Sequence, residues 1–266
     1  MALKELLPES LRGPARRLRA AWRESARRRH ARATHRRVRA ERDERIRRYV
    51  AAHPVVKLQL GSGSNHLAGW LNTEGFEPSS FTHSLDIAEA CVYLDVCERF
   101  PFADNTVDYI FHEHVMEHLT YPQGLQMLRE CCRVLKPGGR LRTAMPDFAY
   151  FISLYAQPSD AALAHFTDEY VRFNSSVWSK DLVDVHDNKP VFVINHALRA
   201  WGHRFLYDYD TLCGALATAG FIAPIRCRPG ESADSNLRGI EYRRELVGIA
   251  DALIVESLKP RSPTAT

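Results

Sequence analysis

The sequence predicts an α/β domain, built on a parallel or mixed sheet with helices on both faces, behind a basic N-terminal helical arm. Short strand-like segments alternate with helices or long crossovers between residues 55 and 258, the pattern of a sheet covered by helices. Charge divides the chain as well. Residues 1–50 carry 17 basic and 6 acidic side chains, whereas the remainder of the 266-residue chain carries 19 and 26. A basic segment therefore precedes an acidic body.

Composition excludes several classes of protein. Hydrophobic residues make up 45% of the chain and charged residues 26%, which is ordinary for a globular protein and excludes wholesale disorder and fibrous folds. No apolar run approaches the roughly 18 residues of a membrane span, and the start, MALKELLPES, lacks the apolar run of a signal peptide. The six cysteines show no C-x-x-C spacing, so we expect reduced thiols and a cytoplasmic protein.

The arm is expected to cover residues 1–53. It contains no glycine between Pro14 and Tyr49, and its apolar positions form only a thin helical stripe that includes Leu18 and Trp22. Such a helix buries little and is expected to be largely exposed. It is either a solvated helix packed weakly on the body or, through residues 14–49, a contact for an anionic membrane or a polyanion such as nucleic acid.

The body is expected to span residues 54–260, followed by a disordered tail at 261–266. Its strand-like segments are 55–60, 70–73, 92–96, 108–111, 140–144, 221–227 and 252–256. Thr120 and Gln123 have the spacing of a capping box, which predicts a helix that ends at Lys136-Pro137-Gly138-Gly139. A second helix is predicted from Thr211 to Ala219, with Asp208 or Asp210 as its cap and Gly220 as its stop. Residues 148–206 are expected to be a less regular insertion on the substrate side.

Functional residues are expected where the first strands end. Gly61 and Gly63 let the backbone pass close to a ligand after the first strand. His66 stands where the dinucleotide fingerprint requires a third glycine, and no P-loop signature is present, so an NAD or P-loop site is not favoured. Glu74 and Asp95 end the second and third strands. Each fits a loop carboxylate or helix cap, but together they favour a pocket for an adenosine group.

Five segments in order carry a resemblance to a known family. They are Leu60-Gly-Ser-Gly-Ser64, Gly69-Trp-Leu-Asn-Thr-Glu74, Phe100-Pro-Phe-Ala-Asp-Asn-Thr-Val-Asp108, His114-Val-Met-Glu-His-Leu119 and Arg133-Val-Leu-Lys-Pro-Gly-Gly-Arg-Leu141. Together they resemble the class I S-adenosylmethionine-dependent methyltransferases, and within these the type 11 group that acts on small molecules. The resemblance is strong over residues 56–148 and fainter through residues 205–212, 219–221 and 255–260.

The resemblance implies a Rossmann-like, seven-stranded, mostly parallel sheet with one antiparallel strand, and S-adenosyl-L-methionine as cofactor. By position, the residues implied at the cofactor are Gly61, Ser62 and Gly63 beneath its methionine end and ribose, Glu74 at the ribose hydroxyls, Asp95 beside adenine, and the backbone of His112 and Glu113 at the methionine portion. The short link from Gly63 to the second strand departs from the family pattern. It indicates that the usual first helix is truncated.

Transfer to a hydroxyl benefits from a base with a pKa near neutrality, which histidine provides. His114 is the first candidate and His203 another, while Asp147 could orient an acceptor or a histidine; His186 and His196 are further candidates. The aromatic stretches at 148–155 and 166–178 either wall a pocket or pack a core. We expect methyl transfer to a small-molecule or saccharide-like acceptor, at oxygen. The alternative is a catalytically inactive cofactor-binding fold whose arm binds nucleic acid or an anionic membrane.

His114-Val-Met-Glu117-His118 also matches the H-x-x-E-H pattern of a zinc-peptidase helix. That reading needs a helix through the motif and a third ligand. The capping box at Thr120 leaves fewer than two helical turns for it. We therefore expect no metal ion in the protein, and a structural role for His118, with its ring bonded to backbone.

Overall fold

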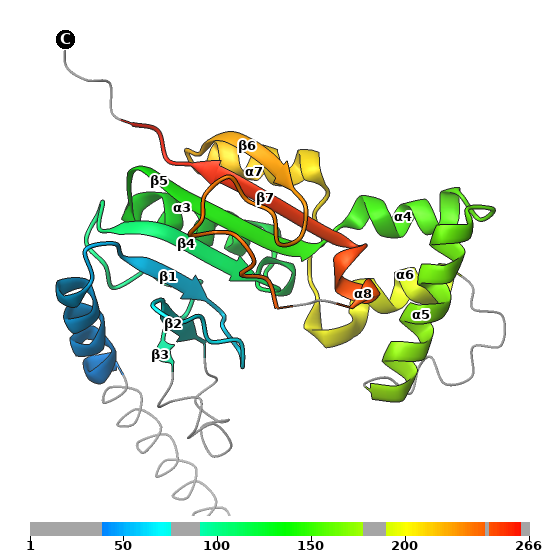
Figure 1. Ribbon diagram of the computed structural model, residues 1–266, viewed down its shortest axis with the longest axis horizontal. Helices are drawn as coiled ribbons and strands as arrows, with labels where there is room; N and C mark the ends of the chain where they lie inside the picture. Colours follow the sequence, from blue (N-terminus) through cyan, green and yellow to red (C-terminus); the bar gives the residue numbers. More distant parts are fainter. Residues whose placement is uncertain (1–38, 76–90, 178–189, 243–244, 262–266) are drawn as a thin grey trace, which may run out of the picture.

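The computed structural model describes residues 39–75, 91–177, 190–242 and 245–261. It contains a seven-stranded sheet in the order β3-β2-β1-β4-β5-β7-β6 (Figure 1). The strands are β1 (Lys57–Leu60), β2 (Leu71–Glu74), β3 (Val92–Tyr93), β4 (Val107–Glu113), β5 (Leu135–Pro146), β6 (Ile222–Cys227) and β7 (Ala252–Leu258). β7 runs antiparallel to β5 and β6, and the four other strand pairs are parallel. The predicted fold class, a mostly parallel sheet with one antiparallel strand, is confirmed.

One face of the sheet carries the main hydrophobic core. Leu58 of β1 pairs with Ile110 of β4, which pairs with Leu141 of β5, and all three side chains are fully buried on this face. Helices α3 (Tyr121–Val134) and α7 (Tyr209–Thr218) pack against it. On the opposite face, a smaller cluster around Phe111 and Ile254 is covered by loop residues Trp70 and Leu237. Residues 61–70 contain no helix, as the truncated link predicts.

The predicted caps and stop signals of α3 and α7 are present in the structure. The Thr120 backbone N–H donates to Gln123 Oε1 at 3.0 Å, and the capping box opens α3. Asp208 is the cap of α7, since its side chain accepts from the Thr211 backbone N–H at 2.8 Å. Gly220 follows that helix with φ +100°, a left-handed conformation that glycine adopts readily at helix ends.

The helix over residues 39–52 differs from the expectation of a largely exposed arm. Ile46 is 3% exposed and belongs to the main core. The Tyr49 hydroxyl donates to the Gly69 carbonyl at 2.9 Å, and Arg39 pairs with Glu98 at 2.5 Å. The sequence shows only a sparse apolar stripe in this part of the arm. Ile46, Tyr49 and Val50 nevertheless lie on one face of the helix, and their contacts suffice to dock residues 39–52 on the core. Residues 1–38 of the predicted arm, and residues 262–266 of the predicted tail, lie outside the described residues.

The insertion at 148–206 is more regular than expected. Helices α4 (Phe148–Ala156), α5 (Ala161–Val177) and α6 (Pro190–Arg199) pack together beyond the strand ends, beside α8 (Leu246–Ile249) (Figure 1). Part of the predicted aromatic stretch forms their core, with Phe166 and Tyr170 nearly inaccessible. Helix α4 reads FAYFISLYA and is apolar on most sides, so it lacks the polar–apolar alternation by which a helix is recognised. None of the helices within the described ranges is long and apolar enough to cross a membrane.

Candidate active site

A cavity of about 820 Å³ lies where β1, β2, β3 and β4 end. Its wall includes seven of the ten residues that the sequence predicts for the site: Gly61, Ser62, Gly63, Glu74, Asp95, Glu113 and His114. The volume is within the range of pockets for cofactors and other small molecules. Because parallel strands bring their carboxyl ends to one edge of the sheet, residues far apart in the sequence meet here.

The glycine loop after β1 fits a closely approaching ligand. Gly61 has φ +59°, and a Cβ there would lie 2.5 Å from Val115 Cγ2. Gly63 has φ +51°, but a Cβ there would meet nothing within 4 Å, so the backbone borders open space. The Ser62 backbone N–H donates to the Thr73 carbonyl at 2.9 Å and fixes the loop to β2. The loop is held in place from behind and leaves a surface on which a ligand can lie.

Glu74 is oriented by two backbone amides. Its carboxylate accepts from Gly63 N at 2.7 Å and from Gly75 N at 3.1 Å. Burial raises the pKa of Glu74, although these amides and nearby His66 act in the opposite direction. An ionised carboxylate offers about four lone-pair sites, so two acceptor positions remain for ligand hydroxyls. Asp95, after β3, is held in turn by the Cys97 N–H at 2.8 Å.

A cysteine that the sequence did not single out lies beneath the glycine loop. Cys91 Sγ is 3.1 Å from Ser62 Oγ and 3.1 Å from His66 Nε2. Burial raises the pKa of this thiol, which keeps it neutral. Its only signal in the sequence was its place one residue before a predicted strand.

His114 has the least ordinary backbone at the site. It follows β4 with φ +54°, a conformation that non-glycine residues adopt at a cost and that is common at functional positions. Its Nδ1 donates to Glu117 Oε1 at 2.8 Å, so Nε2 is the ring nitrogen that is not used in this hydrogen bond. Burial pushes the pKa of fully buried Glu117 upward, but the hydrogen bond and charge of His114 and the charge of His118 outweigh it and hold that pKa below its usual range.

A second cavity, of about 190 Å³, shares His114, His118 and Trp201 with the first. The helical insertion supplies its other walls, including Phe151, Tyr170, Asn174 and His203. Burial lowers the pKa of His203. His196, another candidate, donates to or accepts from the Tyr170 hydroxyl at 3.0 Å behind this wall. The predicted His203 therefore lines the smaller cavity together with His114.

Two predicted residues are not brought to these cavities. His112 is fully buried within the sheet, where its Nε2 lies 3.0 Å from Thr143 Oγ1 and burial lowers its pKa to about 4. Asp147 caps α4 by accepting from Ala149 N at 3.0 Å and forms an ion pair with Arg226. Both side chains serve the scaffold, although the prediction for His112 concerned its backbone. The candidate His186 lies outside the described residues.

Comparison with known proteins identifies the segment that carries the glycine loop. Residues 58–143 match a family model described as a methyltransferase domain. A malonyl-[acyl-carrier protein] O-methyltransferase of Methylococcus capsulatus is 32% identical over 109 residues, which cover 35% of this chain and 38% of that protein. The chain thus matches well under half the length of that relative.

Solved structures show weaker likenesses. A methyltransferase from Thermotoga maritima is 16% identical over 79% of this chain and 87% of its own, with a TM-score of 0.45. One from Archaeoglobus fulgidus is 12% identical over 82% and 92%, with a TM-score of 0.43. At these scores neither informs on the acceptor. The segment from β1 to β5 thus matches a methyltransferase domain, in agreement with its resemblance to the type 11 group, and this family implies S-adenosylmethionine as cofactor.

Proposed function

We propose that the protein is an S-adenosylmethionine-dependent methyltransferase that methylates a hydroxyl of a small, saccharide-like acceptor. One observation carries the proposal: a cavity of about 820 Å³ at the strand ends shares His114 with a smaller cavity of about 190 Å³. The first has the size and polar groups to hold the cofactor. The second lies on the other side of the same histidine and is suited to the acceptor.

The residues of the larger cavity fit the cofactor. Gly63 borders open space and Gly61 also lines the cavity, so the ribose and the methionine end can lie on the loop backbone. Glu74, with two acceptor positions remaining, would accept from the ribose hydroxyls. Asp95 would accept from the adenine amino group. Glu113, whose carboxylate accepts from the Tyr242 backbone N–H at 2.8 Å, lines the end of the cavity nearest His114.

His114 is proposed as the base. When bound, S-adenosylmethionine supplies an electrophilic methyl group on a sulfonium. Glu117 holds Nδ1 of His114 in the protonated form, so Nε2 can take the proton of an acceptor hydroxyl. Attack of the acceptor oxygen on the methyl carbon would break the bond from that carbon to sulfur and would leave the proton on the imidazole of His114. The hydrogen bond to Glu117 orients the ring, and the left-handed backbone at His114 is the kind of strain that is common at functional sites.

The smaller cavity supports the choice of acceptor. Tyr170 and Trp201 give it aromatic surface, and Asn174 and Asp251 give it amide and carboxylate groups. Aromatic rings cover the apolar face of a sugar or similar polar ring, while amides and carboxylates bind its hydroxyls. A volume of about 190 Å³ favours a small acceptor or one ring of a larger one.

The first experiment measures unfolding of the purified chain with S-adenosylmethionine, S-adenosylhomocysteine or NAD. A ligand at 100 times its dissociation constant adds roughly 2.7 kcal/mol to folding stability. We expect both sulfur compounds to stabilise the protein and NAD to have no effect. Asp95→Ala should weaken the stabilisation. No response to either sulfur compound would reject the assignment of this cavity.

The second experiment follows transfer of a labelled methyl group to a panel of sugars, phenols and amines. We expect labelled ether products from hydroxyl acceptors. His114→Gln should bind the cofactor normally and lose transfer by roughly 10²- to 10⁴-fold, the usual contribution of a general base. His165→Ala, an exposed change on α5, is the control. Unchanged transfer by His114→Gln would remove His114 from the reaction.

A further inference from the structure

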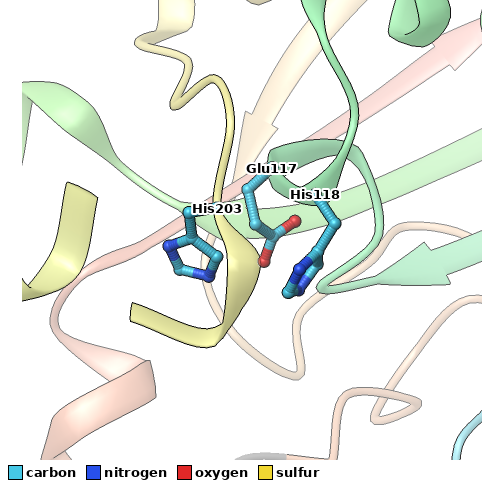
Figure 2. A group of neighbouring side chains, drawn as sticks. All are labelled: Glu117, His118 and His203. Carbon is cyan, nitrogen blue, oxygen red and sulfur yellow. The ribbon is translucent and has the colours of Figure 1, made fainter. Parts of the chain in front are cut away.

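Glu117, His118 and His203 form a cluster in the wall between the two cavities. Their nearest ligand atoms, one from each residue, all lie within 4.8 Å of one another. Figure 2 shows the carboxylate of Glu117 between the two imidazole rings. Glu117 and His118 belong to the short 3₁₀ helix η3 (Met116–His118), whereas His203 directly follows η5 (Ala200–Gly202).

Backbone hydrogen bonds hold these two segments together. The Arg204 N–H donates to the Glu117 carbonyl at 2.7 Å, and the Phe205 N–H approaches the same oxygen at 3.3 Å. His203 is the neighbour of Arg204 in the chain, so these bonds place its ring beside Glu117. The imidazoles of His118 and His203 stand edge to face, with their centroids 4.9 Å apart. The fold therefore brings the three residues together, and hydrogen bonds orient Glu117 and His203.

Glu117 has an unused oxygen inside the protein. Its side chain is 0% exposed, and Oε1 accepts from His114 Nδ1 at 2.8 Å. Oε2 is buried without a hydrogen-bond partner among the described residues. A buried carboxylate oxygen with no partner is costly, and a bound cation removes that cost.

The two histidines present nitrogens suited to a cation. His203 Nδ1 lies 2.6 Å from the Ala197 carbonyl. A carbonyl only accepts, so Nδ1 carries the proton and Nε2 keeps its lone pair. Metal-binding histidines are typically oriented in this way by their second nitrogen. The ring of His118 makes no hydrogen bond within the described part of the chain and can turn toward the cluster.

We propose that Glu117 Oε2, His118 and His203 bind a divalent transition-metal ion, with Zn²⁺ as the ion that the ligand set fits. One carboxylate and two imidazoles with open positions remaining is a donor set of catalytic zinc sites. Tetrahedral bonds of about 2.0–2.1 Å place ligand atoms roughly 3.3 Å apart, so the three ligand atoms, which lie within 4.8 Å of one another, would close in on a bound ion. The sequence alone predicts no metal, and this proposal departs from that prediction.

The site differs from the peptidase pattern that the sequence shares. In H-x-x-E-H the two histidines are ligands on one helix. Here His114 is bonded to Glu117 and does not belong to the cluster, while His203 comes from 85 residues beyond His118. His118 and His203 both line the smaller cavity, so open metal positions face the acceptor. Building on the proposed function, the metal would hold an acceptor oxygen beside His114.

The test uses the full chain without a histidine tag, stripped with a chelator and then titrated with Co²⁺ as a coloured substitute for Zn²⁺. We expect one equivalent to bind with visible absorption bands of a four- or five-coordinate ion, and Zn²⁺ to displace it. His118→Ala and His203→Ala should each weaken binding by more than about 100-fold, beyond the effect of an outer-shell change. His165→Ala, on exposed α5, should bind normally.

Glu117→Gln is a third variant. Because Glu117 is buried, its replacement also disturbs packing, so the two histidine variants decide the test. Weak binding of several equivalents, or full affinity in His118→Ala and His203→Ala, would overturn the site. Unfolding with S-adenosylhomocysteine is measured on stripped and reloaded protein in parallel. Stabilisation without metal binding would overturn only the metal site, whereas metal binding without stabilisation would overturn only the methyltransferase assignment.

Discussion

At the level of single residues, the two glycines of the loop after β1 have different surroundings. Gly61 and Gly63 both have left-handed backbones, at φ +59° and +51°. Only Gly61 is also packed, against Val115, whereas Gly63 borders the open cavity. A side chain at Gly61 is therefore opposed by backbone conformation and by contact with Val115, and one at Gly63 by backbone conformation and by the proposed cofactor.

Replacing each glycine by alanine separates these effects. A left-handed non-glycine residue costs roughly 1–2 kcal/mol, so Gly63→Ala should lose about that much stability. Gly61→Ala should lose more, because its Cβ would lie 2.5 Å from Val115 Cγ2. Urea unfolding of both variants without ligand measures the difference. Equal losses would mean that Val115 moves freely. Gly63→Ala should in addition bind S-adenosylhomocysteine more weakly than its stability loss explains.

Helix α3 is anchored by its last turns as well as by its cap. The Arg133 guanidinium donates to the Phe100 and Phe102 carbonyls, each at 2.9 Å, and to the carboxylate of Glu130. Glu130 also accepts from the Phe100 N–H at 2.7 Å. Burial pushes the pKa of Glu130 upward, but the Arg133 and Phe100 hydrogen bonds outweigh it and leave that pKa below its ordinary value. The pair ties α3 to the loop that precedes β4.

This anchor gives the folded state a defined dependence on pH. The pKa of Glu130 is lower in the folded than in the unfolded chain. Its contribution to the free energy of unfolding is therefore complete above the ordinary glutamate pKa of about 4.3. It is lost as pH falls through the folded value. Glu130→Gln should therefore be less stable at pH 7 and lose less on acidification. Unfolding at several pH values tests this, with exposed Glu231→Gln as control. Parallel curves for wild type and Glu130→Gln would contradict it.

At the level of the whole molecule, the helix over residues 39–52 supports the wall of the larger cavity. Ile46 enters the main core, and Arg45 donates to the Cys91 carbonyl at 2.7 Å. Cys91 in turn contacts Ser62 of the glycine loop. The described arginines of this basic segment contact the body or nearby carboxylates. The predicted membrane or polyanion contact through residues 14–49 stays a prediction.

Removing the core contact of this helix should be felt throughout the fold. Ile46→Ala is expected to cost 2–5 kcal/mol, the usual range for a buried large-to-small change. Arg47→Ala, whose side chain is 74% exposed, should stay within about 0.5 kcal/mol of wild type. Chemical denaturation measures both. A loss below about 1 kcal/mol for Ile46→Ala would mean that the helix is not part of the folded unit.

What could be predicted from the sequence depended on how local each signal was. The strands and the capping box at Thr120 are signalled by neighbouring residues and were predicted, and the cap of α7 was narrowed to Asp208 or Asp210, of which the structure has Asp208. Helix α4 was missed because its apolar side chains cover most of its surface. The proximity of His118 and His203 depends on the backbone hydrogen bond between Arg204 and Glu117. No local sequence pattern predicts this long-range contact. His203 was nevertheless a candidate, and Glu117 was noticed only within the peptidase pattern.

The antiparallel strand has a consequence for how the chain assembles as it is made. Among the described strands, β6 pairs only with β7, and β7 lies between β5 and β6. A ribosome releases β6 before β7, so the earlier strand emerges with no place to dock. β6 can join the sheet only through β7, whether β7 adds to β5 first or the two strands pair before they dock. Until β7 has been synthesised, β6 therefore remains an unpaired strand with exposed backbone groups, which is a risk for aggregation.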